Sequence, residues 1–167
     1  IGKHRILDFT DFEQAGEYAI EYGGIKTPYF RIGEQIWENS QWKVLNFIFC
    51  QRCGYNVPGI HSTCHTDLYS EHNGTRIPYS GGWHDAGDLS QQTLQTADVT
   101  FALLESYRKA LQSNPVLASR LKEEARWGLE FVMKNRYSDG YRASSMGLLH
   151  WLDGVVGSKD DIKTVRI

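Results

Sequence analysis

The chain has 167 residues, a formal net charge of −2 and an aromatic content of 13%. This length is sufficient for one ordinary domain with a sizeable core. The balanced charge, without a basic cluster, argues against nucleic acid or an anionic membrane surface as a partner, and no apolar run is long enough to be inserted in a membrane. The sequence does not indicate an oligomeric state.

The first residues alternate with the period of two that is typical of strands. Ile6 to Phe9, Tyr18 to Tyr22 and Tyr29 to Ile32 are predicted extended runs, separated by polar or glycine-containing turns. Three strands cannot close a sandwich. These opening residues therefore differ in character from the rest of the chain.

Three helices are predicted after these residues. The segment from Trp42 to Gln51 is short and strongly apolar, and the segment from Leu89 to Leu111 carries one apolar stripe. Apolar residues at helical spacing between Leu117 and Val132 indicate a third helix. The residues from Arg142 to Ile167 fit no recognisable pattern.

The segment from Gly81 to Asp88 reads Gly-Gly-Trp-His-Asp-Ala-Gly-Asp and places two carboxylates, Asp85 and Asp88, three residues apart. Because an apolar stripe comes next in the chain, we expect both aspartates where a loop becomes a helix. The free N–H groups and the dipole of the helix would keep them ionised and able to accept protons. The alternative is that the pair caps the helix and Gly87 provides backbone freedom.

Two cysteines and two histidines supply the ligand set of a closed tetrahedral zinc site. They are Cys53, Cys64, His65 and His84. The loop from Asn56 to Ser80 is long and polar, and a structural zinc ion would anchor both of its ends. His61 lies near Cys64 and could replace one ligand.

Other interpretations of the three cysteines remain open. Cys53 and Cys64 could form a disulfide that leaves Cys50 free, or all three could be buried thiols beside solvent-facing histidines. The spacing of Cys50 and Cys53 is that of a redox motif, but the pair ends an apolar helix instead of opening one after a strand.

The segment from Gly81 to Asp88 resembles the Gly-Gly-Trp-(Tyr/His)-Asp-Ala-Gly-Asp signature of glycoside hydrolase family nine, the inverting cellulases and their relatives. Upstream, Phe47 to Gly54 resembles the aromatic helix of that family, which ends in Gln-Arg-Cys-Gly, and Cys64-His65 resembles its Cys-His pair. Downstream, Ala125 to Phe131 resembles the next helix of the family, and Asp139 to Tyr141 resembles the loop that closes that helix.

The resemblance implies a mainly α fold. Residues 34–167 would form an incomplete N-terminal part of an (α/α)6 barrel, and residues 1–33 would be the last strands of a preceding immunoglobulin-like β-sandwich. The full barrel needs far more residues than this chain has, so we expect a piece of a larger enzyme. A first residue that is Ile instead of Met agrees with this expectation.

The implied reaction is the inverting hydrolysis of β-1,4-glucosidic bonds in cellulose or related β-glucans. Such enzymes need a carboxylate base for the water and a separate acid about 6.5–9.5 Å away for the leaving oxygen. By resemblance, Asp88 matches the base and Asp85 matches the residue that holds the water. Some members of the family carry zinc at the motif positions of the two cysteines and two histidines.

The general acid of the family is a Glu near the end of its barrel, and nothing between Arg142 and Ile167 resembles that motif. The segment alone is therefore expected to be inactive. Four other glutamates lie on helices among Lys and Arg, where a solvated face is expected. They are Glu105, Glu123, Glu124 and Glu130.

Sugar rings stack on flat aromatic side chains, and Trp83 and Tyr141 are the candidate substrate-binding residues. Trp83 could instead serve packing. Tyr79 and Trp151 are further possibilities, whereas Trp127 and Phe131 are expected in the core. Just after the signature, the segment Leu89 to Gln92 departs from many relatives, which leaves the precise substrate open.

Two other functions remain open, a noncatalytic zinc-stabilised carbohydrate-binding module and an exo-acting glucosidase or glucosaminidase on the same fold. Because a glucan polymer cannot cross a membrane, the resemblance also implies a protein that works outside the cytoplasm. It would be secreted, periplasmic or attached to the cell surface.

Overall fold

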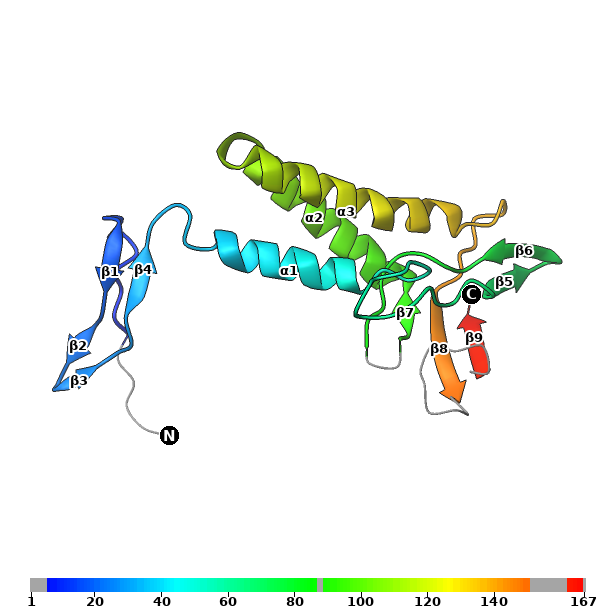
Figure 1. Ribbon diagram of the computed structural model, residues 1–167, viewed down its shortest axis with the longest axis horizontal. Coiled ribbons are helices and arrows are strands. Elements are labelled where there is room, and N and C mark those ends of the chain that lie inside the picture. Colours follow the sequence, from blue (N-terminus) through cyan, green and yellow to red (C-terminus); the bar gives the residue numbers. More distant parts are fainter. Residues whose placement is uncertain (1–5, 87–88, 151–161, 167) are drawn as a thin grey trace. The chain divides into compact units, whose positions relative to one another are not determined.

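The computed structural model describes residues 6–86, 89–150 and 162–166, and its elements are shown in Figure 1. The chain divides into two compact units, Ile1–Lys43 and Val44–Ile167. Among the described residues, no helix combines the length and the apolar character needed to cross a membrane.

The first unit contains two pairs of short antiparallel strands. Strand β1 (Gly16–Tyr18) pairs with β4 (Phe30–Ile32), and β2 (Glu21–Tyr22) pairs with β3 (Ile25–Lys26). The turn between β2 and β3 consists of two glycines with φ of 59° and 79°, a conformation that a tight hairpin requires and that favours glycine. The predicted run from Tyr29 to Ile32 is confirmed as β4. The predicted run from Tyr18 to Tyr22 is divided: Tyr18 ends β1, Glu21 and Tyr22 form β2, and the two residues between them belong to neither strand.

The predicted strand from Ile6 to Phe9 is wrong, because this segment has no strand partner among the described residues. Its contact with the hairpin is made by side chains: the Phe9 and Phe30 rings lie 5.7 Å apart. Alternating apolar residues can serve such packing without joining a sheet. The assignment of these strands to an immunoglobulin-like sandwich and the boundary near Gly33 stay predictions.

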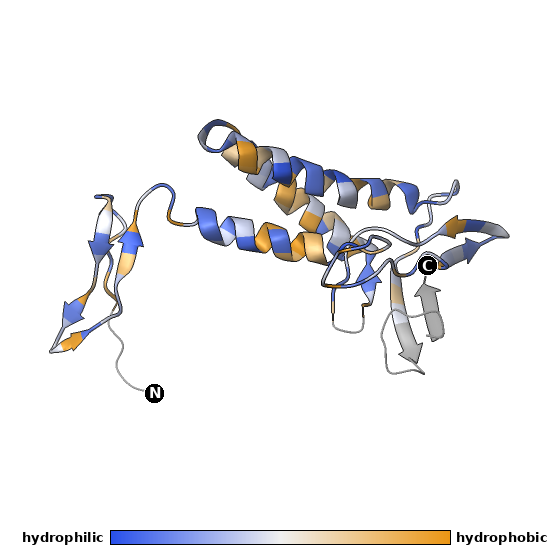
Figure 2. Ribbon diagram, in the orientation of Figure 1, coloured by the Kyte–Doolittle hydropathy of each residue, from blue (hydrophilic) through white to orange (hydrophobic). Residues whose placement is uncertain are grey.

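The three predicted helices are confirmed as α1 (Glu38–Cys50), α2 (Thr93–Ser113) and α3 (Pro115–Lys134). Figure 2 shows that the apolar residues of α1 gather in its C-terminal half. Helices α2 and α3 lie side by side (Figure 1) and are joined through Asn114 alone. The Asn114 side chain accepts a hydrogen bond from the Leu117 N–H and so caps α3, whose first residue is a proline suited to that position.

The start of α2 differs from the prediction. Strand β7 (Gln91–Gln92) precedes the helix and pairs with β8 (Ser145–His150), which pairs in turn with β9 (Ile162–Arg166). Asp85 therefore lies in a loop before β7, and its predicted place at a helix N-terminus is wrong. Local periodicity could not reveal a strand whose partner is so distant in sequence, and the left-handed φ of 55° at Leu89 interrupts a helical path.

The face that α2 turns inward is not its stripe of large apolar residues. Leu94 and Phe101 of that stripe are exposed. The buried residues of α2 are mostly small, and they are Thr93, Thr96, Thr100, Leu103 and Ala110. Small side chains let two helices approach closely, and Gly128 of α3 meets this face: a Cβ at Gly128 would overlap with the Thr100 hydroxyl.

The segment from Asn56 to Ser80, predicted as a polar loop, contains a hairpin and part of the core. Strand β5 (Tyr69–His72) pairs with β6 (Thr75–Pro78). One core cluster lies where this hairpin, the end of α3 and β8 meet, and it comprises Leu68, Tyr79, Phe131, Ala143 and Met146. The loop is therefore anchored by apolar packing in addition to its cysteines and histidines.

Candidate metal centre and catalytic loop

The candidate site is built on a short antiparallel contact between the end of α1 and the glycine-rich segment. The Cys53 N–H donates to the Gly82 carbonyl at 2.9 Å, the His84 N–H donates to the Gln51 carbonyl at 2.8 Å, and Arg52 faces Trp83 between them. Successive side chains of an extended strand point to opposite faces. This contact therefore places Cys53 and His84 on one face and Arg52 and Trp83 on the other.

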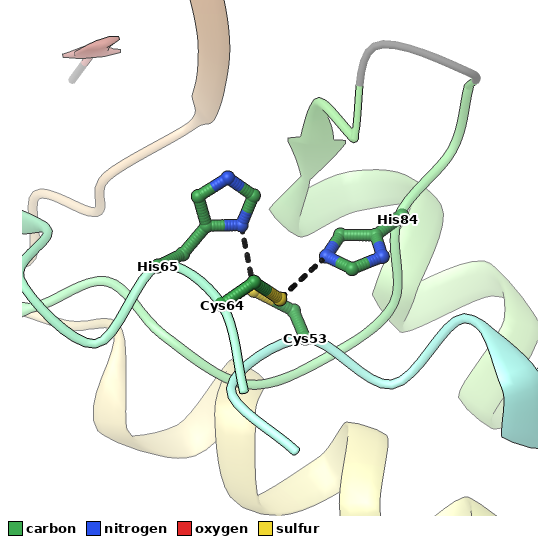
Figure 3. A group of neighbouring side chains, drawn as sticks. All are labelled: Cys53, Cys64, His65 and His84. Atoms are coloured by element: carbon green, nitrogen blue, oxygen red, sulfur yellow. Dashed lines mark hydrogen bonds between the residues drawn. The ribbon is translucent and has the colours of Figure 1, made fainter. Parts of the chain in front are cut away.

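The four predicted metal ligands come together on the first of these faces. They are Cys53, Cys64, His65 and His84, all buried, and their ligand atoms lie within 4.8 Å of one another. Figure 3 shows both imidazole rings directed toward the cysteine side chains. The Cys53 Sγ lies 3.3 Å from His65 Nδ1, and the Cys64 Sγ lies 3.3 Å from His84 Nε2.

These distances fit a tetrahedral ion. With zinc bonds of about 2.3 Å to sulfur and about 2.0 Å to nitrogen, neighbouring ligand atoms are about 3.3–3.8 Å apart. The two sulfur–nitrogen distances of 3.3 Å are at this spacing. A donor set of two thiolates and two imidazoles also binds zinc in preference to calcium or magnesium, which favour oxygen ligands. The cluster can therefore hold a metal ion with only small adjustments.

The protonation of the two thiols is coupled. A hydrogen bond between the two cysteine side chains raises the pKa of Cys53, and burial raises it further. The same hydrogen bond lowers the pKa of Cys64, helped by hydrogen bonds from His65 and His84. Burial acts in the opposite direction on Cys64 and raises its pKa. A metal ion that binds both sulfurs would displace any proton that the pair retains.

The other interpretations of the cysteines differ from this geometry in particular points. All three cysteines are free, so no Cys53–Cys64 disulfide is formed. Cys53 and Cys64 are buried thiols, but Cys50 is half-buried outside the cluster, and His65 and His84 are buried instead of facing solvent. His61 uses its ring nitrogens elsewhere: Nδ1 lies 2.8 Å from the Ser62 carbonyl and Nε2 lies 3.1 Å from the Cys50 carbonyl. His61 therefore ties the end of α1 to the loop and does not replace one of the four ligands.

Asp85 comes directly after His84 but is exposed. Its Oδ1 accepts a hydrogen bond from the Ser90 hydroxyl at 2.6 Å, its Oδ2 lies 3.4 Å from Gln92 Nε2, and its N–H donates to the Ser90 carbonyl at 2.8 Å. Ser90 and Gln92 therefore orient Asp85, and both belong to the segment Leu89 to Gln92, in which this sequence departs from many relatives. Gly87 and the candidate base Asp88 lie outside the described residues.

Trp83 lies on the opposite face, where it is 6% exposed. Its indole N–H donates to Glu124 Oε1 at 2.7 Å, and its ring fills the space that a Cβ at Gly128 would occupy. This environment favours the packing alternative for Trp83. Contact between its ring and a glycan stays a prediction.

The other aromatic candidates are divided between surface and core. Tyr141 is exposed, and its ring lies 4.5 Å from the ring of His72, so its role in substrate binding stays a prediction. Tyr79 is fully buried, with its hydroxyl 3.1 Å from the Thr93 hydroxyl, and belongs to the core. Phe131 is buried as expected, and Trp151 lies outside the described residues.

Three of the four helix glutamates lie on a solvated face, as expected. They form exposed ion pairs, and these are Glu105–Arg108, Glu123–Arg120 and Glu130–Arg126. The expectation is wrong for Glu124, which is 3% exposed and pairs with the buried Arg52 at 2.7 Å. A signal was present in the sequence, because Glu124 lies at helical spacing between Leu121 and Gly128, both on the buried stripe of α3.

The chain belongs to glycosyl hydrolase family 9, since the model of that family matches residues 37–160. Its relatives include Endoglucanase D of Acetivibrio thermocellus, which is 28% identical over 161 residues that cover 81% of this chain and 25% of the relative.

Solved structures give the same result for the fold. A metagenome-derived glycoside hydrolase family 9 endoglucanase is 26% identical, with a TM-score of 0.68 over 96% of this chain and 33% of its own. A Zn-binding triple mutant of the family 9 endoglucanase J30 is 21% identical, with a TM-score of 0.69 over 96% of this chain and 35% of its own. The chain is thus a partial α/α barrel and spans about one third of these structures.

Proposed function

We propose that the chain is the N-terminal segment of the catalytic domain of an enzyme that hydrolyses β-1,4-glucosidic bonds of cellulose or related β-glucans with inversion. The observation that carries this proposal is the match to glycosyl hydrolase family 9 across residues 37–160, a span that includes both aspartates of the signature. The names of the relatives, which are endoglucanases, support a glucan as the substrate.

In this proposal Asp88 is the general base and Asp85 positions the water. The exposure of Asp85 supports its role, because a residue that holds a nucleophilic water must be open to solvent. Its hydrogen bonds with Ser90 and Gln92 hold the carboxylate in one orientation. The general acid belongs to the part of the enzyme beyond this segment.

The second part of the proposal is a structural zinc ion held by both cysteines and both histidines of the cluster. The ion would supply folding energy and no chemical step, because all four positions of the tetrahedron would be occupied by protein ligands. The burial of the cluster and the 3.3 Å sulfur–nitrogen distances support this role. Such an ion would hold the end of α1, the loop around Cys64 and the chain entering Asp85 in register.

The test of the reaction uses the full-length protein that contains this sequence. We expect it to release reducing ends from a soluble β-glucan, and nuclear magnetic resonance should show the α-anomer as the first product of each cleavage. A first product with the β-anomer would contradict inversion. Binding of the glucan without hydrolysis would favour a carbohydrate-binding module instead. Because the substrate is a polymer, we also expect the protein outside the cytoplasm, and fractionation can check this.

A further inference from the structure

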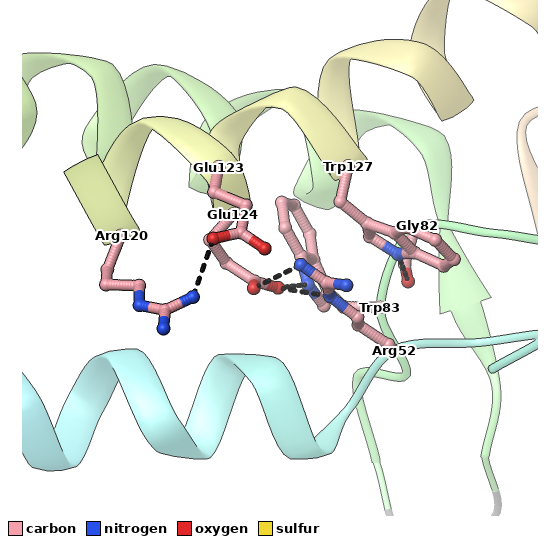
Figure 4. Close-up of polar contacts among 7 residues, drawn as sticks. All are labelled: Arg52, Gly82, Trp83, Arg120, Glu123, Glu124 and Trp127. Carbon is pink, nitrogen blue, oxygen red and sulfur yellow. Dashed lines mark hydrogen bonds and ion pairs between the residues drawn. The ribbon is translucent and has the colours of Figure 1, made fainter. Parts of the chain in front are cut away.

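The second face of the contact between α1 and the glycine-rich segment is closed by a single buried carboxylate. Glu124 Oε1 accepts hydrogen bonds from Trp83 Nε1 at 2.7 Å and from Arg52 Nε at 3.1 Å, and Glu124 Oε2 accepts from Arg52 Nη2 at 2.7 Å (Figure 4). The Arg–carboxylate pair is thus bidentate, a geometry that fixes both partners in orientation. Glu124 therefore links the two facing residues of the contact to α3.

Neighbouring groups keep Arg52 and the backbone in place. The guanidinium of Arg52 lies 4.7 Å from the Trp127 ring and 4.9 Å from the Phe49 ring, distances typical of cation–π contacts. The Trp127 N–H also donates to the Gly82 carbonyl at 2.8 Å, the same carbonyl that accepts from the Cys53 N–H. Side chains of α3 thus hold both the side chains of this contact, Arg52 and Trp83, and its backbone at Gly82.

The position of Trp83 is further fixed by shape. A Cβ at Gly128 would overlap with the far edge of the Trp83 ring, so the ring lies in a notch that only glycine leaves open. The ring cannot move toward α3, and the bond to Glu124 limits its rotation. The backbone of Trp83 is therefore held firmly just before the metal ligand His84.

We propose that Glu124 is a positioning residue for the metal centre: by holding Arg52 and Trp83 on one face of the contact, it sets the spacing of Cys53 and His84 on the other. The inference rests on the proposed zinc site. A ligand pair placed in advance loses less freedom when the ion binds, so the clamp formed by Glu124, Arg52 and Trp83 raises the affinity for the metal. It also fixes the geometry that the ion adopts.

The experiment uses the 167-residue chain and two metals. Zinc affinity is measured by competition with a chelator, and the visible bands of bound Co²⁺ report the ligand geometry. In Glu124→Gln a neutral amide replaces the carboxylate, so one of the two acceptor oxygens becomes an NH2 donor. We expect zinc affinity to fall about tenfold or more, as it does for other residues that orient metal ligands. The Co²⁺ bands should shift or broaden.

The matched control is Glu123→Gln, which neutralises the neighbouring exposed glutamate of α3 and its surface pair with Arg120. This variant should keep the wild-type affinity and Co²⁺ spectrum. A second variant, Trp83→Phe, keeps an aromatic ring and the Arg52–Glu124 pair but removes one hydrogen bond. It should lower zinc affinity about fivefold and change the spectrum in the same direction.

Each outcome decides a separate point. A variant that has only lost stability would bind less metal but show the wild-type Co²⁺ spectrum, and this would overturn the positioning role. Folded variants with unchanged affinity and spectrum would overturn it as well. If Glu124→Gln does not fold, as judged by circular dichroism, Trp83→Phe decides. A wild-type chain that binds neither metal would overturn the zinc proposal itself and this inference with it.

Discussion

His84 and Asp85 are neighbours in sequence but belong to two different regions of the molecule. His84 is 5% exposed and faces candidate ligands that come from distant parts of the chain, whereas Asp85 is exposed and forms hydrogen bonds with Ser90 and Gln92, a few residues away in sequence. The protein therefore separates two tasks across one peptide bond. The buried side fixes the backbone, and the open side presents a carboxylate to water.

The two regions should respond differently to substitution. Replacing a buried polar residue, such as Glu124 or a cysteine of the cluster, leaves other buried polar groups without partners, which lowers the free energy of unfolding. Removing a member of the exposed loop leaves groups that water can solvate, so stability should change little while the proposed chemistry is lost. Metal removal and substitutions in each region can test this difference, from the largest expected effect to the smallest.

The largest effect should come from removal of the metal. Structural zinc sites of this type bind with apparent free energies of about 10–16 kcal/mol, so a chelator should lower the melting temperature of the zinc-loaded chain strongly. Cys53→Ser and Cys64→Ser should abolish stoichiometric zinc, as measured by elemental analysis. Cys50→Ser is the matched control, because Cys50 lies outside the cluster and should leave zinc content unchanged. A natively folded, metal-free protein with a Cys53–Cys64 disulfide would contradict the prediction.

The next effect concerns turnover in the full-length protein. Asp88→Asn removes the proposed base, and general-base assistance contributes about 10²–10⁴-fold, so turnover should fall by at least that order with glucan binding retained. Asp85→Asn should reduce turnover less, since it only orients the water. The melting temperature of Asp85→Asn should stay near the wild-type value, because the side chain is exposed. An Asp88→Asn protein that hydrolyses glucan at the wild-type rate would refute the mechanism.

A smaller effect is expected from Gly128→Ala on the buried side. The added methyl group would overlap with the Trp83 ring and the Thr100 hydroxyl, and overpacking typically costs about 1–3 kcal/mol. Urea unfolding of the 167-residue chain measures this loss. The matched control is Gly147→Ala, where a Cβ would meet no atom within 4 Å among the described residues. Equal stability of the two variants would show that the notch for Trp83 does not constrain the fold.

The smallest change in stability is expected for Ser90→Ala. The variant loses the 2.6 Å hydrogen bond to Asp85, but water can replace it, so the free energy of unfolding should change by about 1 kcal/mol or less. Zinc content should not change. Turnover of the full-length protein should fall, though less than in Asp85→Asn, because Asp85 keeps its charge but loses its main orienting partner. A loss of zinc in Ser90→Ala would mean that the two regions are not separate.

Local patterns in the sequence were enough to predict the three helices and the four residues of the cluster. Helical spacing of apolar residues depends on neighbours a few positions away, and the metal ligands were recognisable by residue type. The start of α2 was missed because β7 exists only through its pairing with β8. The role of Glu124 was missed because Arg52, its partner, lies far away in sequence, although a charged residue on the apolar stripe of α3 was a usable signal.

The single residue between α2 and α3 makes the length of this turn part of the site. The turn has no second residue to absorb an insertion, and an extra residue taken up by α3 itself would shift the helix by one residue, which corresponds to a rotation of about 100°. Glu124, Trp127 and Gly128 would then turn away from the glycine-rich segment together. The hairpin between these helices should therefore tolerate substitutions at its surface far better than any insertion or deletion, and its length should be kept when segments of such enzymes are recombined.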